Sequence, residues 1–157
     1  MDDLSGKLLD DLLGTSGTSG YESAVQQVVR DFLAPFAAKI TTDLHGNVIG
    51  WLNPAAPHRI LIDAHCDQIG LIVSYIDDSG YLYVQPVGGW DPQQLVGQQV
   101  TVHTANGPVP GVISRKAIHL LEDSERNQVV KLQDLWIDIG AANSAEAKER
   151  VRVGDSA

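Results

Sequence analysis

The sequence contains one cysteine, Cys66, so no disulfide can form within the chain. This usage fits a reducing compartment, and we expect a cytoplasmic protein. Basic residues are also scarce, with 11 against 20 acidic residues, and the net charge of −9 lacks the positive footprint of a nucleic-acid binder. No apolar run approaches a bilayer span, and the N-terminus has no signal-peptide pattern. We therefore expect neither a nucleic-acid nor a membrane partner.

Two helices are predicted in the first 35 residues. The first follows from leucines spaced along one helical face: Leu4, Leu8, Leu9, Leu12 and Leu13. After a Gly/Ser/Thr loop at residues 14–20, Ser19 and Glu22 have the spacing of a capping box before the second helix. That helix has one apolar stripe, made by Val25, Val28, Val29, Phe32 and Leu33. Pro35 ends it.

Strand patterns follow the helices. Residues 40–43 and 48–52 flank a turn and predict a hairpin. The run Arg59–Ala64 is short and continuously apolar, which indicates a strand buried on both faces. His65 would then lie at the C-terminal end of this strand, where open α/β sheets usually bind their ligands.

The sequence beyond Gln68 is punctuated by turns and predicts mostly strands. Short apolar segments occur at residues 71–76, 81–84, 99–104, 109–113 and 135–139, and a helix is predicted from residue 143 to about 151. Such spacing favours a small β-barrel or a sandwich. The fold class is thus α/β, with a helix-and-strand zone to about Gln68 and a β-rich zone from about Ile69 to Arg152.

His65 and Asp67 are the residues most suggestive of chemistry. In an extended segment, residues two apart point to the same side, so both can face one crevice while Cys66 points away. A neutral imidazole can bind a divalent metal through one nitrogen while a carboxylate accepts the other N–H. The alternative is structural, with His65 capping a strand end and Asp67 starting the turn to Gly70.

Several motifs in this order resemble the M42 family of metalloaminopeptidases. The carrying segments are the Ala-His-Cys-Asp-Gln-Ile-Gly motif at residues 64–70, the Asp-Leu-His-Gly-Asn hairpin at 43–47, Ser19–Glu22, Val87–Gly89, Leu95–Gln98, Gly111–Ile113, His119–Leu121 and Asp138–Ala141. The similarity runs from about residue 15 to the end. One departure is Gln68, where the family usually has glutamate.

The resemblance implies an aminopeptidase that removes N-terminal residues from peptides with two divalent ions, zinc or cobalt. It implies that residues 1–68 begin a catalytic α/β domain, that 69–152 form a PDZ-like insertion domain used for homo-oligomer assembly, and that 153–157 start the return to the catalytic domain. His65 matches a metal ligand, and Asp67 matches the catalytic-site carboxylate that holds it. The remaining ligands and the general base would lie in an absent C-terminal part, so we expect the chain alone to be inactive.

Two other functions stay open at this point. A non-catalytic β-domain acting as an assembly or binding module would also explain the second zone. An endoglucanase-type hydrolase would need two carboxylates flanking an aromatic cleft, which the dispersed Trp51, Trp90 and Trp136 do not suggest. His119 is either a structural histidine or part of a loop that reaches a substrate pocket. Cys66 fits a small apolar residue better than a nucleophile.

Overall fold

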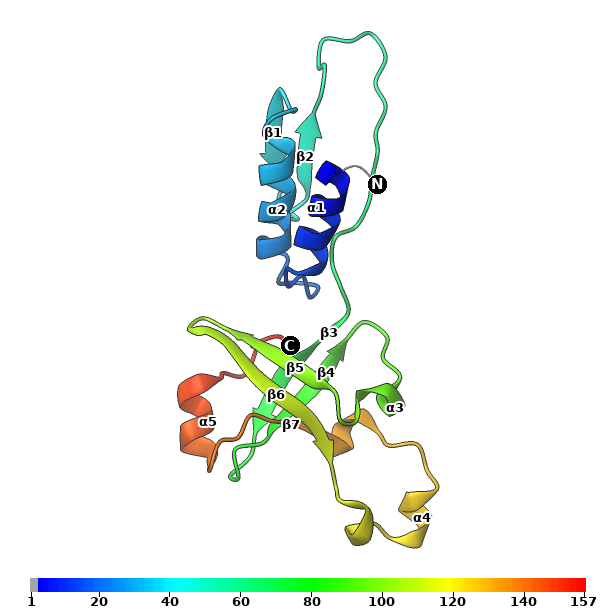
Figure 1. The fold of residues 1–157 in the computed structure, drawn as a ribbon, viewed down its shortest axis with the longest axis vertical. Helices are drawn as coiled ribbons and strands as arrows, with labels where there is room; N and C mark the ends of the chain where they lie inside the picture. The colour runs from blue at the N-terminus through cyan, green and yellow to red at the C-terminus, as the bar shows by residue number, and fades with distance from the viewer. Residues whose placement is uncertain (1–2) are drawn as a thin grey trace. The chain divides into compact units, whose positions relative to one another are not determined.

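The computed structural model describes residues 3–157, which fold into two compact units. The first unit ends at Gln68, and the second runs from Ile69 to Ala157. The first unit contains two helices and a hairpin, and the second contains five strands and several short helices. Figure 1 labels these elements along the chain. The chain is therefore a mixed α/β protein, as the sequence predicts. Among the described residues, no helix combines the length and apolarity needed to cross a bilayer.

The two predicted helices of the first unit are present. α1 spans Asp3–Leu13 and α2 spans Ser23–Leu33, and they lie side by side. α2 also packs on the hairpin, because a Cβ added at Gly50 would lie 2.9 Å from Leu33 Cδ1. However, α1 buries no residue and α2 buries only Val25, and a largely apolar groove of about 370 Å³ stays open between them. The two helices thus leave much of their apolar surface uncovered.

The hairpin of the first unit forms where the sequence predicts it. Its strands are β1 (Lys39–Thr42) and β2 (Val48–Trp51), paired antiparallel. Asp43 organises the turn, because its Oδ1 accepts the backbone N–H groups of His45 and Asn47. Asn47 Nδ2 also donates to Asp43 Oδ2 at 2.7 Å. These hydrogen bonds hold the pKa of Asp43 below its ordinary value, and the bond from the Asn47 side chain has the largest effect.

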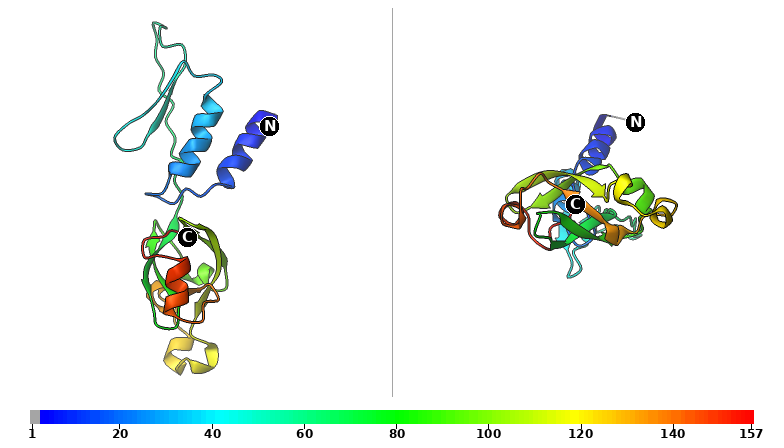
Figure 2. Two further views of the ribbon diagram at one scale, coloured as in Figure 1. Left: turned by 90° about the vertical axis from the view of Figure 1, so that its left-hand side faces the viewer. Right: turned by 90° about the horizontal axis from the view of Figure 1, so that it is seen from below.

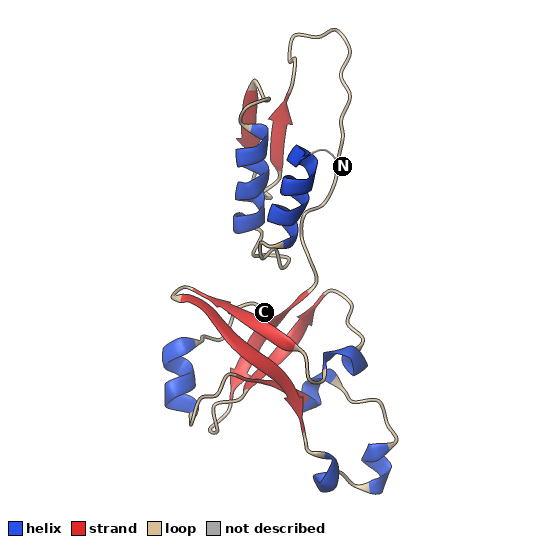
Figure 3. Ribbon diagram, in the orientation of Figure 1, coloured by secondary structure: helices blue, strands red, loops and turns tan. Residues whose placement is uncertain are grey.

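Residues 59–64 depart from the sequence prediction. The predicted buried strand is instead an unpaired extended segment, drawn as a loop in Figure 3. Ile60, Leu61 and Ile62 are 89%, 86% and 91% exposed. A strand needs a neighbour to take its backbone hydrogen bonds, and within residues 3–157 no strand pairs with this segment. The strand prediction is therefore wrong for this chain, and the apolar side chains of this segment leave hydrophobic surface exposed in the first unit.

The second unit contains all the strands that the sequence predicts there. They are β3 (Gly70–Ile76), β4 (Leu82–Val87), β5 (Gln99–Thr104), β6 (Gly107–Arg115) and β7 (Leu135–Asp138). They form one antiparallel sheet in the order β3-β4-β7-β6-β5. The helices are α3 (Pro92–Leu95), η1 (Ile118–Leu120), α4 (Asp123–Arg126), η2 (Leu132–Asp134) and α5 (Ser144–Arg150). As predicted, the Asn143 side chain caps α5 by accepting from the Glu146 N–H.

The last residues of the chain close this sheet into a barrel. Ala157 exchanges two backbone hydrogen bonds with Leu71 of β3, at 2.7 and 2.8 Å, and the Ser156 carbonyl accepts the N–H of His103 in β5 at 2.7 Å. Ser156 is consequently 1% exposed. Figure 2 shows the strands curling around a common interior. Of the two architectures that the sequence left open, the barrel is the one formed, and residues 153–157, expected to start a return to another domain, contribute to it.

The barrel interior is filled by branched apolar side chains from every strand, together with Ala147 of α5 and Val151 just after it. The fully buried members include Leu71, Val73, Leu82, Val102, Ile113, Leu135, Ile137 and Val151. Gly111 of β6 faces this interior, and a Cβ added there would lie 2.5 Å from Ile137 Cγ2 and 3.2 Å from Ile139 Cγ2. The absence of a side chain at Gly111 therefore leaves room for the side chains of Ile137 and Ile139.

We predict that Gly111→Ala destabilises the barrel by about 1–3 kcal/mol, because the new methyl group overpacks a filled core. Thermal unfolding followed by circular dichroism would show a lower midpoint. Gly89→Ala is the matched control, since a Cβ at Gly89 meets nothing within 4 Å. Equal midpoints for the two variants would contradict this account of the core.

Candidate metal-binding site

The side chains of His65 and Asp67 meet as the sequence predicts. His65 Nδ1 lies 2.9 Å from Asp67 Oδ1. The histidine side chain is 86% exposed and that of Asp67 is 39% exposed. The ring therefore stands in solvent and is tied to the protein by a single carboxylate oxygen.

The chemistry of this contact defines which ring nitrogen is free. Hydrogen bonds hold the pKa of Asp67 below its ordinary value, with the Ser19 hydroxyl having the largest effect and the His65 ring the next largest. An ionised carboxylate only accepts hydrogen bonds, so Nδ1 of His65 carries the hydrogen and the neutral ring keeps a lone pair on Nε2. That nitrogen is chemically suited to a divalent metal. The described residues contain no group of three or more His, Cys, Asp or Glu side chains able to hold an ion.

Ser19 is a member of the site that the sequence did not reveal. Its Oγ donates to Asp67 Oδ2 at 2.5 Å. The predicted capping box with Glu22 is wrong, because Glu22 is itself the N-cap residue of α2 and its carboxylate accepts from the Gly20 N–H at 2.7 Å. The hydroxyl is thereby left for Asp67. No spacing rule links residues 48 positions apart, so the sequence carried no signal for this bond.

A short backbone pairing brings Ser19 to the site. Thr18 and Gln68 form a parallel bridge, in which the Gln68 N–H donates to the Gly17 carbonyl at 2.7 Å and the Ser19 N–H donates to the Gln68 carbonyl at 3.2 Å. Gly17 permits the close approach, since a Cβ there would lie 2.9 Å from Val25 Cγ1 and 3.2 Å from the carbonyl oxygen of the residue before Asp67. Gln68, the departure from the family pattern, thus contributes here through its backbone.

Cys66 lies between the two site residues and is partly buried. Burial raises the pKa of its thiol most, and the negative charges of Asp67 and Glu22 raise it further. A raised pKa keeps the sulfur protonated, and the thiolate is the reactive form. These surroundings agree with the expectation that Cys66 is not a nucleophile.

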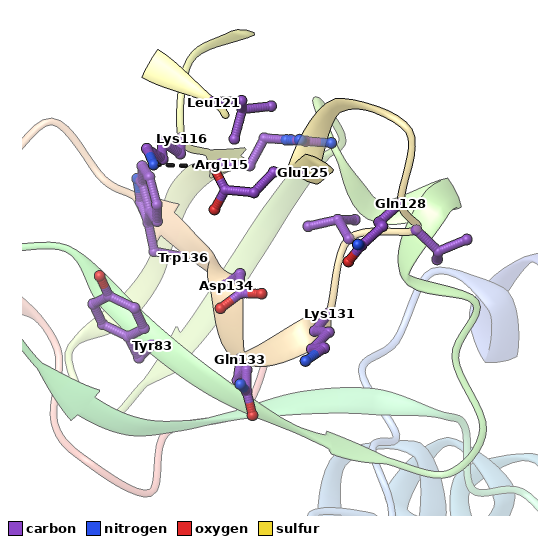
Figure 4. A pocket seen from close by; sticks show the side chains of 12 residues that line it. Tyr83, Arg115, Lys116, Leu121, Glu125, Gln128, Lys131, Gln133, Asp134 and Trp136 are labelled. Atoms are coloured by element: carbon purple, nitrogen blue, oxygen red, sulfur yellow. Dashed lines mark hydrogen bonds and ion pairs between the residues drawn. The ribbon is translucent and has the colours of Figure 1, made fainter. Parts of the chain in front are cut away.

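A separate pocket of about 380 Å³ opens in the second unit (Figure 4). Tyr83 and Trp136 contribute aromatic side chains to its lining. The lining also includes an ion pair between Lys116 Nζ and Glu125 Oε2, 3.2 Å apart. His119 is exposed in η1 and does not line this pocket. The pocket therefore brings together none of the site residues that the sequence singled out.

The structure thus offers one candidate metal ligand, an exposed imidazole oriented by a carboxylate, in a mixed α/β chain with an antiparallel barrel. The family model described as M42 glutamyl aminopeptidase matches residues 46–157, about seven-tenths of the chain. The chain belongs to this family. The motif resemblance that the sequence suggested is thereby confirmed.

Individual relatives agree with this membership. The lysyl aminopeptidase of Pyrococcus furiosus is 33% identical over 145 residues, covering 91% of this chain and 42% of the relative. The TET aminopeptidase of Thaumarchaeota archaeon SCGC AB-539-E09 has a TM-score of 0.93 at 38% identity, covering 98% of this chain and 43% of that one. The Pyrococcus horikoshii TET1 peptidase, which can assemble into a tetrahedron or a large octahedral shell, has a TM-score of 0.79 at 34% identity, over 95% and 45%. The chain thus spans less than half the length of these relatives.

We predict that Gly17→Ala loosens the pairing beside the site, because its methyl group would overlap Val25 and cost about 1–3 kcal/mol. The Gln68 amide, which donates to the Gly17 carbonyl, should then exchange with solvent about 10-fold faster by NMR-detected hydrogen exchange. Gly6→Ala serves as the control, because nothing lies within 4 Å of a Cβ there. Unchanged protection of Gln68 in Gly17→Ala would contradict the proposed role of Gly17.

Proposed function

We propose that this chain is part of a metal-dependent aminopeptidase that removes N-terminal residues from peptides, and that His65 is one of its metal ligands. The observation that carries the proposal is the bond between His65 Nδ1 and Asp67 Oδ1, located in a segment that the M42 family model covers. Relatives matched over most of this chain, such as the lysyl aminopeptidase, carry the activity in their names.

The two residues have distinct roles in this proposal. His65 presents the Nε2 lone pair, and the high exposure of the ring leaves that nitrogen open to a ligand. Asp67 accepts the Nδ1 hydrogen, which fixes the ring orientation and increases the basicity of Nε2. When bound, divalent ions would polarise the scissile carbonyl and lower the pKa of a water molecule. Zinc or cobalt is the expected metal.

The proposed site is incomplete within residues 3–157. One imidazole and one carboxylate that holds it cannot bind two metal ions or provide a general base. We infer that the further ligands belong to the parts of the relatives that this chain does not match, which exceed half their length. The exposed side chains of Ile60, Leu61 and Ile62 agree with this view, because a strand flanked by such partners would be covered on both faces.

We propose that the second unit is the PDZ-like insertion domain of the family and that the complete protein forms a homo-oligomer through it. Support comes from the closed barrel and from the TET1 peptidase relative, which assembles into large shells. The first unit, to Gln68, would begin the catalytic domain. A non-catalytic assembly module is the competing function, and metal content together with turnover distinguishes the two.

We predict that His65→Ala in the complete enzyme removes one metal ion per subunit and nearly all turnover of peptide substrates. Asp67→Asn should keep the fold but weaken metal affinity or rate by roughly 10- to 100-fold. This is the usual effect when a metal-ligating histidine loses the carboxylate that accepts its other N–H. Plasma mass spectrometry and peptide hydrolysis measure the two quantities. His58→Ala is the control, since His58 is also exposed in the first unit. Full metal content and normal turnover in His65→Ala would refute the assigned role.

The isolated 157-residue chain should show no aminopeptidase turnover when supplied with zinc or cobalt, because residues 3–157 hold no group of three or more side chains able to bind an ion. A peptide-hydrolysis assay on the purified chain tests this. Turnover that depends on added metal and vanishes with a chelator would show that the site is complete without other residues.

A further inference from the structure

We propose that Ser19 is a positioning residue for the His65–Asp67 pair. Its hydroxyl donates to the Asp67 oxygen that His65 does not use, and so holds the carboxylate in the orientation that selects the Nδ1–H form of His65. The consequence for metal binding rests on the proposed function, whereas the effect on the histidine ring does not. Residues 17–19 would therefore act on a site that lies 48 positions further along the chain.

The two oxygens of Asp67 have different partners, and this arrangement restricts rotation of the carboxylate. Oδ1 lies 2.9 Å from His65 Nδ1, and Oδ2 accepts from Ser19 Oγ at 2.5 Å, the short distance typical of a hydroxyl donating to an ion. The terminal torsion of an aspartate is otherwise broad. A rotation that moved Oδ1 away from the ring would also break the bond to Ser19.

The position of the Ser19 hydroxyl is fixed by backbone bonds that do not involve Asp67. The Ser19 N–H donates to the Gln68 carbonyl, and the Gln68 N–H donates to the Gly17 carbonyl. The hydroxyl also lies 3.5 Å from the Gln68 carbonyl oxygen, but this contact is 1 Å longer than the one to Asp67, so the carboxylate is its acceptor. Because its backbone is held by these bonds, Ser19 presents its hydroxyl to the carboxylate from a fixed position.

The exposure of His65 makes such a restraint necessary. At 86% exposure the ring has few packing contacts that would set its rotamer or tautomer. Its orientation then depends on Asp67, and that of Asp67 depends in turn on Ser19. Loss of the hydroxyl should leave the fold intact, free the carboxylate to rotate, and return the ring toward the Nε2–H tautomer that unrestrained histidine favours in water.

The test uses long-range ¹H–¹⁵N NMR of the histidine rings in this chain at about pH 8, where histidine with an ordinary pKa is neutral. Wild-type His65 should be mainly the Nδ1–H tautomer. Ser19→Ala should shift most of the population to Nε2–H, and Ser19→Thr, which keeps a hydroxyl, should restore the wild-type signal. Ser16→Ala in the same loop is the matched control, and Asp67→Asn shows the signal of a ring without the carboxylate.

Backbone amide spectra establish that each variant is folded, and an unaltered His65 tautomer in folded Ser19→Ala would overturn the proposal. If Ser19→Ala does not fold, an Nε2–H ring in the wild-type chain would overturn it equally. In the complete enzyme, Ser19→Ala should weaken zinc affinity by roughly 10-fold in a chelator competition, the low end for such partners. A tautomer shift in a protein whose His65→Ala variant keeps all its metal would support the positioning role and reject the proposed function.

Discussion

The site in the first unit depends on the two hydrogen bonds that the Asp67 carboxylate accepts. One oxygen holds His65 and the other holds Ser19, so the imidazole is connected to the loop before α2 through a single side chain. The strand that was expected to carry His65 is unpaired in this chain, and its apolar residues are exposed. The geometry of the site therefore derives from the loop at residues 17–19 and its bridge to Gln68, rather than from a sheet.

Local sequence signals predicted most of the fold. Leucine and valine spacing located α1 and α2, turn residues located the β1–β2 hairpin, and alternating segments located all five barrel strands. These signals succeed because amphipathic periodicity and turn chemistry are properties of neighbouring residues. The same reasoning explains the failure at residues 59–64. A continuous apolar run reports that a segment is suited to burial, but it does not report whether partner strands are present to bury it.

The site could be predicted only in part for a related reason. The His-x-Asp spacing is local, so the contact between His65 and Asp67 followed from the geometry of an extended chain. Ser19 was assigned to a helix cap because a serine and a glutamate three residues apart have the spacing of a capping box. Its actual partner is determined by tertiary structure. The barrel closure by Ser156 was missed similarly, since the chain end shows no strand pattern and pairs on both sides only after the sheet has curled.

The central claim is that His65 is a metal ligand whose ring is oriented by Asp67. The most direct measurement is a crystal structure of the proposed complete enzyme grown with zinc, with the metal located by anomalous scattering. The account predicts an ion bonded to His65 Nε2 at about 2.0–2.1 Å, with Nδ1 donating to Asp67. A zinc centre formed without His65, while that ring remains in solvent, would contradict it.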